Sequence, residues 1–198
     1  MHLVDSLGRN KKLTYISCLH EQGAVIAAGA YAQYTNNLST ALVTTGPGGT
    51  NAITGVAAAW VESIPLLIIS GQVKRQDISS SNGTRSLGFQ EIKITPVVKN
   101  ICKYAVTVID PTEIRYHLEK AVYLAKSGRP GPVWLDIPLD VQAALIDEKK
   151  LKGFIPPSQN TTIAHINNKI TKLVDLLNKS KRPVILAGYG IKLSNAQE

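Results

Sequence analysis

The stretch "LVTTGPGGTNAITGVAAAWVESIPLLIISGQV" (residues 42–73) contains two short apolar runs, separated by a glycine turn and a longer segment rich in alanine. The runs Ala41–Thr45 and Leu66–Ser70 are continuously apolar, which is typical of strands that are buried on both faces of a sheet. A strand, a helix and a second strand in this order predict an α/β fold: a parallel sheet flanked by helices.

The same alternation of short apolar runs and helical patterns continues on both sides of this stretch. The helix at 111–127 has complete end signals, because Asp110 can cap it, Pro111 suits its first position and Gly128 can end it. The helix near 20–34 is apolar nearly all round, which predicts packing on several sides, in the core or against another subunit. Further strands are predicted at Leu13–Cys18, Tyr104–Ile109, Val133–Ile137 and Val184–Ala187.

The 198 residues are enough for one domain and the start of a second. Charges, two prolines and polar residues fill 143–160, which predicts a linker between a first domain at 1–142 and a truncated second α/β domain at 161–198. No apolar run is long enough to span a membrane, and the N-terminus lacks a secretory signal. Cys18 and Cys102 lie in apolar runs and are interpreted as buried thiols in a reducing compartment. We therefore expect a cytoplasmic protein that makes no membrane contact.

A net charge of +8 and a pI near 9.5 raise the hypothesis of nucleic-acid binding. The basic residues are scattered, however, and the densest cluster, "DEKKLK" (147–152), also contains acids. Aromatic residues make up 6% of the chain, too few for an evident base-stacking surface. The pattern favours solvated lysines and no nucleic-acid partner, and a basic nucleic-acid-binding protein is kept as the less favoured alternative.

The glycine turn "TTGPGGTN" (44–51) fits neither of two common phosphate loops. It lacks the lysine of the P-loop, and its third glycine is misplaced for the Gly-x-Gly-x-x-Gly fingerprint. Taken alone, it is either a tight turn between a strand and a helix or part of a ligand site, and both interpretations stay open.

Glu21 lies in the first turn of the apolar helix near 20–34. The helix dipole alone would explain an acid at this position. A carboxyl group beside apolar packing can also have its pKa raised by desolvation, which would suit it to exchange a proton near neutrality. Gln72 ends a predicted strand, where open α/β sheets place ligands, and "GFQE" (88–91) follows a polar loop.

Four segments resemble, in order and spacing, thiamine-diphosphate enzymes of the acetolactate synthase-like group. They are "HEQGAVIAAGAYAQYT", "LVTTGPGGTNAITGVAAAWVESIPLLIISGQV", "FQE" and "GRPGPVWLDIPLDVQ". The resemblance covers about residues 1–142 and implies that group's N-terminal pyrimidine-binding domain. It continues weakly into "RPVILAGYG" (182–190), where the family's central domain begins.

The resemblance also implies roles for individual residues. Glu21 matches the catalytic glutamate that hydrogen-bonds N1′ of the aminopyrimidine and so activates the cofactor. Pro47 and Asn51 match cofactor contacts in the glycine turn, and Gln90 matches a glutamine beside the cofactor and the substrate. Phe89 matches a substrate-pocket residue, and Gln72 is a further candidate for a cofactor contact. "GRPGPV" (128–133) corresponds to a segment near the flavin in FAD-containing relatives, and FAD binding is left open.

The sequence departs from the family at two places. It contains no Gly-Asp-Gly segment of the kind that holds magnesium and the diphosphate, so Mg²⁺ is expected only through an absent domain and no metal ligand is predicted here. The family's first strand also has no counterpart before Met1. These departures predict a fragment of a longer carboligase, a homodimer or tetramer that acts on a 2-oxo acid, expected to be pyruvate. Alone, the chain is expected to be inactive, and a non-catalytic module that pairs with a full-length subunit is the alternative.

Overall fold

The computed structural model describes residues 1–79, 83–158 and 163–196. These residues divide into two compact units, Met1–Ile155 and Pro156–Glu198. Each unit is described by itself, and the first contains every strand found in the described part of the chain.

Four strands of the first unit form one parallel sheet, which confirms the predicted α/β fold. The central strands β2 and β4 pair along seven residues, from Leu66 opposite Pro132 to Gln72 opposite Pro138. The edge strand β1 pairs only with β2, and β3 pairs only with β4. The strands are β1 (Ser39–Val43), β2 (Leu66–Gln72), β3 (Tyr104–Thr107) and β4 (Pro132–Pro138).

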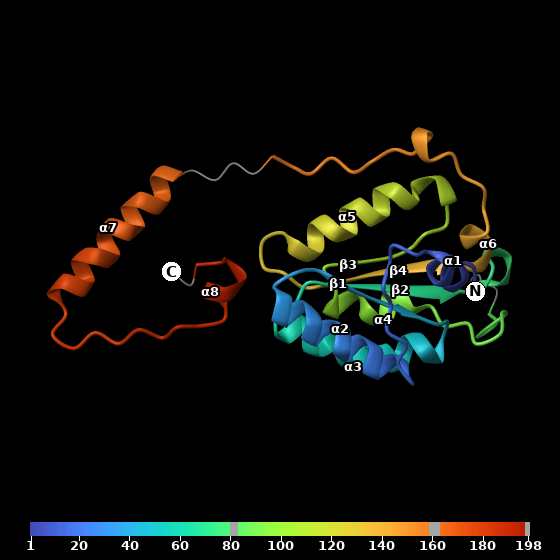
Figure 1. The fold of residues 1–198 in the computed structure, drawn as a ribbon, viewed down its shortest axis with the longest axis horizontal. Coiled ribbons are helices and arrows are strands. Elements are labelled where there is room, and N and C mark those ends of the chain that lie inside the picture. The colour runs from blue at the N-terminus through green and yellow to red at the C-terminus, as the bar shows by residue number, and fades with distance from the viewer. Residues whose placement is uncertain (80–82, 159–162, 197–198) are drawn as a thin grey trace. The chain divides into compact units, whose positions relative to one another are not determined.

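Helices cover both faces of this sheet (Figure 1). On one face, Ile68 and Trp134 pack with residues of α2, α3 and α4, and on the other, Leu67 and Leu135 pack with residues of α5. Successive strand residues point to opposite faces of the sheet. Because helices cover both faces, the residues on both are apolar, which explains the continuous apolar runs. The helices are α1 (His2–Arg9), α2 (Glu21–Thr35), α3 (Pro47–Val61), α4 (Ile94–Val98), α5 (Ile114–Lys126) and α6 (Leu139–Gln142). Short 3₁₀ turns lie at Arg75–Asp77, Lys99–Ile101, Pro111–Glu113 and Glu148–Lys150.

The helix predicted at 111–127 is confirmed as a 3₁₀ turn, Pro111–Glu113, that leads into α5. The Asp110 carboxylate accepts hydrogen bonds from the backbone N–H of Thr112 at 2.8 Å and from its hydroxyl at 2.7 Å. Gly128 follows the helix with φ +58°, the left-handed conformation expected of a terminating glycine.

The apolar helix predicted near 20–34 is confirmed as α2, which packs against α3 and β1. Val25 is fully buried, whereas Tyr31 and Tyr34 are 62% and 85% exposed. The first unit therefore covers one side of this apolar helix and leaves tyrosines on the other.

The strand predicted at Leu13–Cys18 is wrong, since these residues form no regular element in the structure. A strand needs a neighbour for its N–H and C=O groups, and the strand nearest in sequence, β1, pairs with β2. Ile16 is 87% exposed, and Cys18 is also exposed, so its predicted burial is wrong as well. Cys102 is buried as expected, and burial raises the pKa of its thiol to about 12.

The compact first unit continues through Ile155. Phe154 lies against the rings of Tyr116 and Tyr123 on α5, and its backbone N–H donates to Glu119 at 2.7 Å. The first part of the predicted linker 143–160 therefore packs along α5, while 159–160 lie outside the described residues. The assignment of 143–160 as a linker between two domains stays a prediction.

The second unit contains α7 (Ile163–Lys179) and α8 (Gly190–Leu193). The strand predicted at Val184–Ala187 is wrong for this chain, because these residues adopt no strand conformation. Val184 and Leu186 are 92% and 97% exposed, so the described part of this unit offers them neither a strand partner nor a core.

Two helical glycines yield a matched prediction about packing. A Cβ atom on Gly55 of α3 would lie 2.6 Å from Cγ1 of Val25, whereas one on Gly29 of α2 would meet nothing within 4 Å. We expect Gly55→Ala to lower the free energy of unfolding by about 1–3 kcal/mol through overpacking. Gly29→Ala should raise it by up to about 1 kcal/mol through helix propensity. Urea unfolding followed by the fluorescence of Trp60 and Trp134 would measure both, and equal effects of the two changes would contradict the packing argument.

Candidate functional site

The glycine turn after β1 is shaped by the backbone of a distant segment. Gly46 precedes α3 with φ +60°, a conformation that L side chains rarely adopt. A Cβ atom there would lie 1.8 Å from the carbonyl oxygen of Gln90. Pro47 occupies the first helical position, as the fixed φ of proline favours. The turn therefore requires glycine, and it brings Gln90 beside the start of α3.

Glu21 reaches the same turn from α2. A Cβ atom on Gly48 would lie 2.9 Å from Oε1 of Glu21 and 2.4 Å from Cγ2 of Thr44. On the next turn of α3, the side-chain amide of Asn51 donates to Oε2 of Glu21 at 2.9 Å. One oxygen of the carboxylate thus lies against a bare glycine, and the other is held by Asn51.

The hydrogen bond from Asn51 holds the pKa of the Glu21 carboxyl below its usual value, and a backbone hydrogen bond adds to this effect. The expectation that desolvation raises this pKa is therefore wrong for this chain. Glu21 is only partly buried, so the loss of solvent is smaller than the gain from the donors. The carboxylate is ionised at neutral pH and suits the acceptance of a hydrogen bond from a ligand.

The structure brings some of the predicted site residues together and separates others. Glu21, Pro47 and Asn51 meet at the start of α3, with the backbone of Gln90 beside them. The side chain of Phe89 is 85% exposed, and no contact fixes it at this site. The roles of these residues toward a cofactor or substrate stay predictions.

Gln72 occupies a different position, because its side chain is buried at the end of β2. Its Nε2 atom donates to Oδ2 of Asp136 and to the carbonyl oxygen of Ile92, both at 2.9 Å. Its Oε1 atom accepts from the N–H of Val73 at 2.9 Å. Both amide hydrogens of Gln72 are therefore already used within the chain.

Asp136 of β4 is the residue that the sequence-based search missed. Its side chain is 1% exposed and accepts hydrogen bonds from Ser70 at 2.6 Å, from Gln72 at 2.9 Å and from Thr107 at 3.2 Å. Burial raises the pKa of its carboxyl to about 6, although these three donors favour the ionised form. The available signal was an acid inside the otherwise uncharged strand "PVWLDIP" (132–138).

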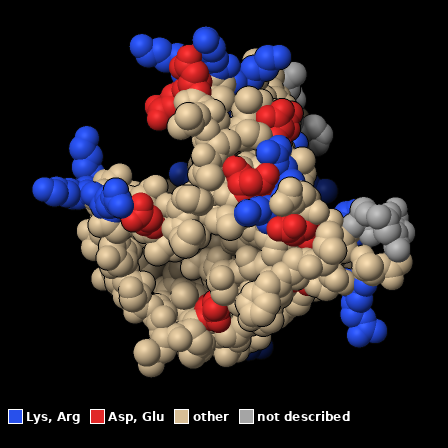
Figure 2. All heavy atoms as spheres, turned by 90° about the vertical axis from the view of Figure 1, so that its right-hand side faces the viewer, with Lys and Arg blue, Asp and Glu red and all other residues tan. Residues whose placement is uncertain are grey.

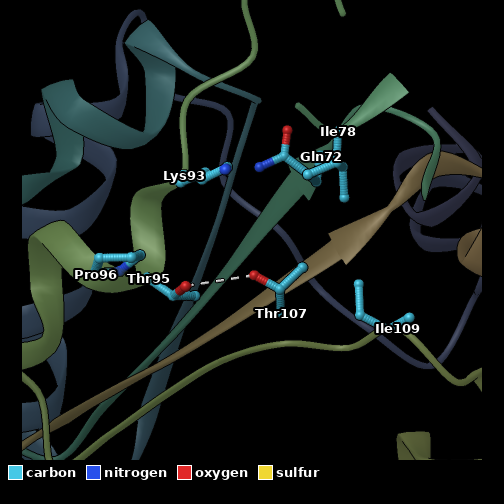
Figure 3. A pocket seen from close by; sticks show the side chains of 7 residues that line it. All are labelled: Gln72, Ile78, Lys93, Thr95, Pro96, Thr107 and Ile109. Atoms are coloured by element: carbon cyan, nitrogen blue, oxygen red, sulfur yellow. Dashed lines mark hydrogen bonds between the residues drawn. The ribbon is translucent and has the colours of Figure 1, made fainter. Parts of the chain in front are cut away.

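A hollow of about 170 Å³ lies beside this network, at the ends of β2 and β3. Figure 3 shows Gln72 and Lys93 on one side of it and Thr95 and Thr107 on the other. The two threonine hydroxyls are 3.5 Å apart. Neither Glu21 nor Asn51 lines the hollow, so it is separate from the carboxylate at the glycine turn.

The surface charges show no single-sign patch on the face in Figure 2, where Lys and Arg alternate with Asp and Glu over the upper part. Among the described residues, no group of three or more His, Cys, Asp or Glu is arranged to hold a metal ion. No helix in the described part of the chain is both long and apolar enough to cross a membrane.

Comparison with known proteins gives a consistent result. Residues 1–97 match the family model described as thiamine pyrophosphate enzyme, N-terminal TPP binding domain. The chain is 34% identical over 197 residues to the acetolactate synthase large subunit of Lactococcus lactis, which covers 98% of this chain and 33% of that protein. It is 36% identical over 204 residues to the corresponding subunit of Buchnera aphidicola, covering 100% of this chain and 34% of that protein. With the chloroplastic acetolactate synthase of Arabidopsis thaliana, it shares 34% identity over 200 residues, which are 96% of this chain and 28% of that protein. The chain thus spans about a third of the length of these curated relatives.

The contact between Asn51 and Glu21 yields a prediction about acidity. We expect Asn51→Ala to raise the pKa of Glu21 toward the usual value of a glutamate, because the main donor to its carboxylate is lost. A lowered pKa in the folded state stabilises the fold above the unfolded pKa, and this contribution is lost as the pH falls. The variant should therefore lose less stability than the wild type on acidification.

Titration of the ¹³C-labelled carboxyl by NMR would measure the change in pKa. Asn37→Ala is a suitable control, since the Asn37 side chain donates to the carbonyl of Thr35 and not to Glu21. A Glu21 pKa that is the same in Asn51→Ala and in the wild type would contradict the assignment.

Proposed function

Because the chain belongs to the acetolactate synthase-like thiamine-diphosphate enzymes, as their N-terminal pyrimidine-binding domain, we propose that it supplies the aminopyrimidine half of a thiamine-diphosphate site. The observation that carries this proposal is the position of the Glu21 carboxylate, whose Oε2 atom accepts from Asn51 and whose Oε1 atom lies close to Gly48, where there is no side chain. The parent activity that we propose is carboligation of a 2-oxo acid, with pyruvate as the substrate.

The residues at the glycine turn fit the aminopyrimidine end of this cofactor. A Cβ atom on Gly48 would lie 2.9 Å from Oε1 of Glu21, so glycine at this position lets the carboxylate approach the start of α3. The carboxylate is only partly buried, which leaves it accessible to a flat ring. An ionised carboxylate accepts a hydrogen bond from a ring N–H, and such charge-assisted bonds are among the stronger ones. Glu21, Pro47 and Asn51 are therefore the residues that we assign to the pyrimidine.

The chemistry of this chain is the control of one proton. With a lowered pKa, Glu21 stays ionised near neutral pH and stabilises a proton on the pyrimidine nitrogen that it faces. When bound, thiamine diphosphate supplies the electron sink that the cleavage of a bond beside a keto group requires. Phe89 and the side chain of Gln90, both exposed, are proposed to contact the substrate.

The diphosphate and Mg²⁺ are proposed to bind outside these 198 residues. The sequence contains no Gly-Asp-Gly, and the described residues offer no cluster of metal ligands. The exposed apolar side chains of α2, Ile26, Tyr31 and Tyr34, support pairing with a further subunit as a homodimer or tetramer. The same surface supports the second candidate function, a non-catalytic module that binds a full-length subunit, and joint purification of the two would test it.

Binding of thiamine tests the proposed site directly. Thiamine carries the aminopyrimidine without the diphosphate, so its binding needs only this half of the site. We expect the wild-type chain to bind thiamine. The Glu21→Gln variant should bind thiamine about tenfold more weakly or worse, because a hydrogen bond to a charged group is lost. Isothermal titration calorimetry would measure both affinities, and circular dichroism would show whether the fold is kept.

Glu62→Gln provides the control, since Glu62 is an exposed acid that follows the opposite end of α3. It should bind thiamine as the wild type does. Wild-type chain that fails to bind millimolar thiamine, or a Glu21→Gln variant that binds as well as the wild type, would refute the proposed site.

The chain tested alone is also expected to show no turnover. With pyruvate, thiamine diphosphate and Mg²⁺, we expect no formation of acetolactate, because these residues supply only the pyrimidine half of the site. A coupled colorimetric assay would detect product, and steady product formation would contradict the assignment of the diphosphate and metal ligands to residues outside this chain.

A further inference from the structure

The buried carboxylate of Asp136 accepts hydrogen bonds from the two strands that flank it. Ser70 and Gln72 come from β2 and Thr107 from β3, while Asp136 lies in β4 between them. The indole N–H of Trp134 donates to the Ser70 hydroxyl at 2.8 Å, so the Ser70 proton is free to point at Asp136. An acid at 1% exposure requires such donors, because a buried polar group without partners is costly.

Gln72 connects this carboxylate to a different segment. One amide hydrogen points to Asp136 and the other to the carbonyl oxygen of Ile92. The orientation of the amide is determined by its partners, since Val73 offers an N–H to the oxygen and Ile92 offers an acceptor to the nitrogen. Rotating the amide by 180° would place its NH₂ group against the N–H of Val73 and its oxygen against the oxygens of Ile92 and Asp136.

Ile92 lies between the two residues that contact the glycine turn from outside. The carbonyl of Gln90 fills the place of a Cβ atom on Gly46, and a Cβ atom on Gly49 would lie 3.3 Å from Cγ1 of Ile94. Gln90 has φ +57°, a left-handed conformation that is unfavourable for a residue other than glycine. Such a conformation persists only where surrounding contacts hold it. The Glu91 carboxylate, which accepts from Ser79 and Leu87, anchors the chain next to Gln90. The bond from Gln72 to Ile92 anchors it two residues after Gln90.

We propose that Asp136 is a positioning residue for the pyrimidine site: it orients the Gln72 amide, which holds the carbonyl of Ile92 and thereby seats Gln90 and Ile94 around the glycine turn. This inference rests on the proposed function for the identity of the ligand. It gives a role to a buried acid that does not itself touch the turn. Gln72, with both amide hydrogens committed, acts within it as the link.

The test compares variants that break the link with one that leaves it intact. Asp136→Leu removes the acceptor from Gln72, and Gln72→Met removes the amide while nearly preserving volume, which keeps the test open if the first variant fails to fold. Thr107→Val is the matched control, because it removes one hydrogen bond to Asp136 but leaves the bond from Gln72 to Ile92. Asp136→Asn should keep the link intact, since the amide oxygen of the new side chain can accept from Gln72 and its NH₂ group can donate to Ser70.

The first measurement needs no ligand. The N–H of Glu91 donates to the carbonyl of Gly88, and the N–H of Thr50 donates to that of Gly46. We expect amide hydrogen exchange at both sites to become at least tenfold faster in Asp136→Leu and Gln72→Met and to stay within about twofold in Thr107→Val and Asp136→Asn. The N–H of Gly131, bonded to Ala125, serves as a remote reference.

The second measurement is thiamine affinity, which should fall about tenfold in the two link-breaking variants and stay unchanged in the other two. Unchanged exchange in Gln72→Met, or equal acceleration in Thr107→Val, would overturn the positioning role. Wild-type chain that binds no thiamine would refute the proposed function instead, while the exchange measurement would still decide whether Asp136 holds the turn.

Discussion

Burial of β4 on all sides is the constraint on which the rest of the first unit depends. Each residue from Pro132 to Pro138 is buried, and the strand is paired on both edges, with β2 and β3. One face of β4 presents Trp134 to α3 and α4, and the other presents Val133 and Leu135 to α5. Because the interior is close-packed, the helices on the two faces are placed relative to each other through this strand.

The candidate site obtains its geometry from the same strand, although none of its ligand-facing groups lies there. Gly49 of α3 is close to the indole of Trp134, at 3.6 Å for a Cβ atom. Asp136 lies two residues further along and is linked through Gln72 to Ile92, which lies between Gln90 and Ile94 in the chain. The Glu21 carboxylate can stay partly exposed and ionised, because its orientation depends on Asn51 and the turn and not on burial.

Sequence reasoning succeeded where local signals decide the structure and failed where distant partners decide it. The helix after Asp110 was predicted correctly, because its cap, its first proline and its final glycine are all within the segment. The strand at Leu13–Cys18 was wrong, because an apolar run becomes a strand only beside another one. Spacing alone excluded two phosphate loops, but it could not show that Gly48 faces Glu21. Asp136 was missed because its three donors come from segments 29 to 66 residues away.

The glycine turn also limits which substitutions this sequence can accept during evolution. A Cβ atom at each of three glycines would meet a different neighbour: the backbone of Gln90 at Gly46, the side chains of Thr44 and Glu21 at Gly48, and the side chain of Ile94 at Gly49. A larger residue at Gly48 needs the side chains of Thr44 and Glu21 to move, and one at Gly49 needs a small shift of Ile94. At Gly46 the obstacle is a backbone atom that no side-chain change removes. The obstacle is therefore largest at Gly46 and smallest at Gly49, and we expect evolutionary variation around this site to accumulate in the exposed positions of α3 before it reaches Gly46.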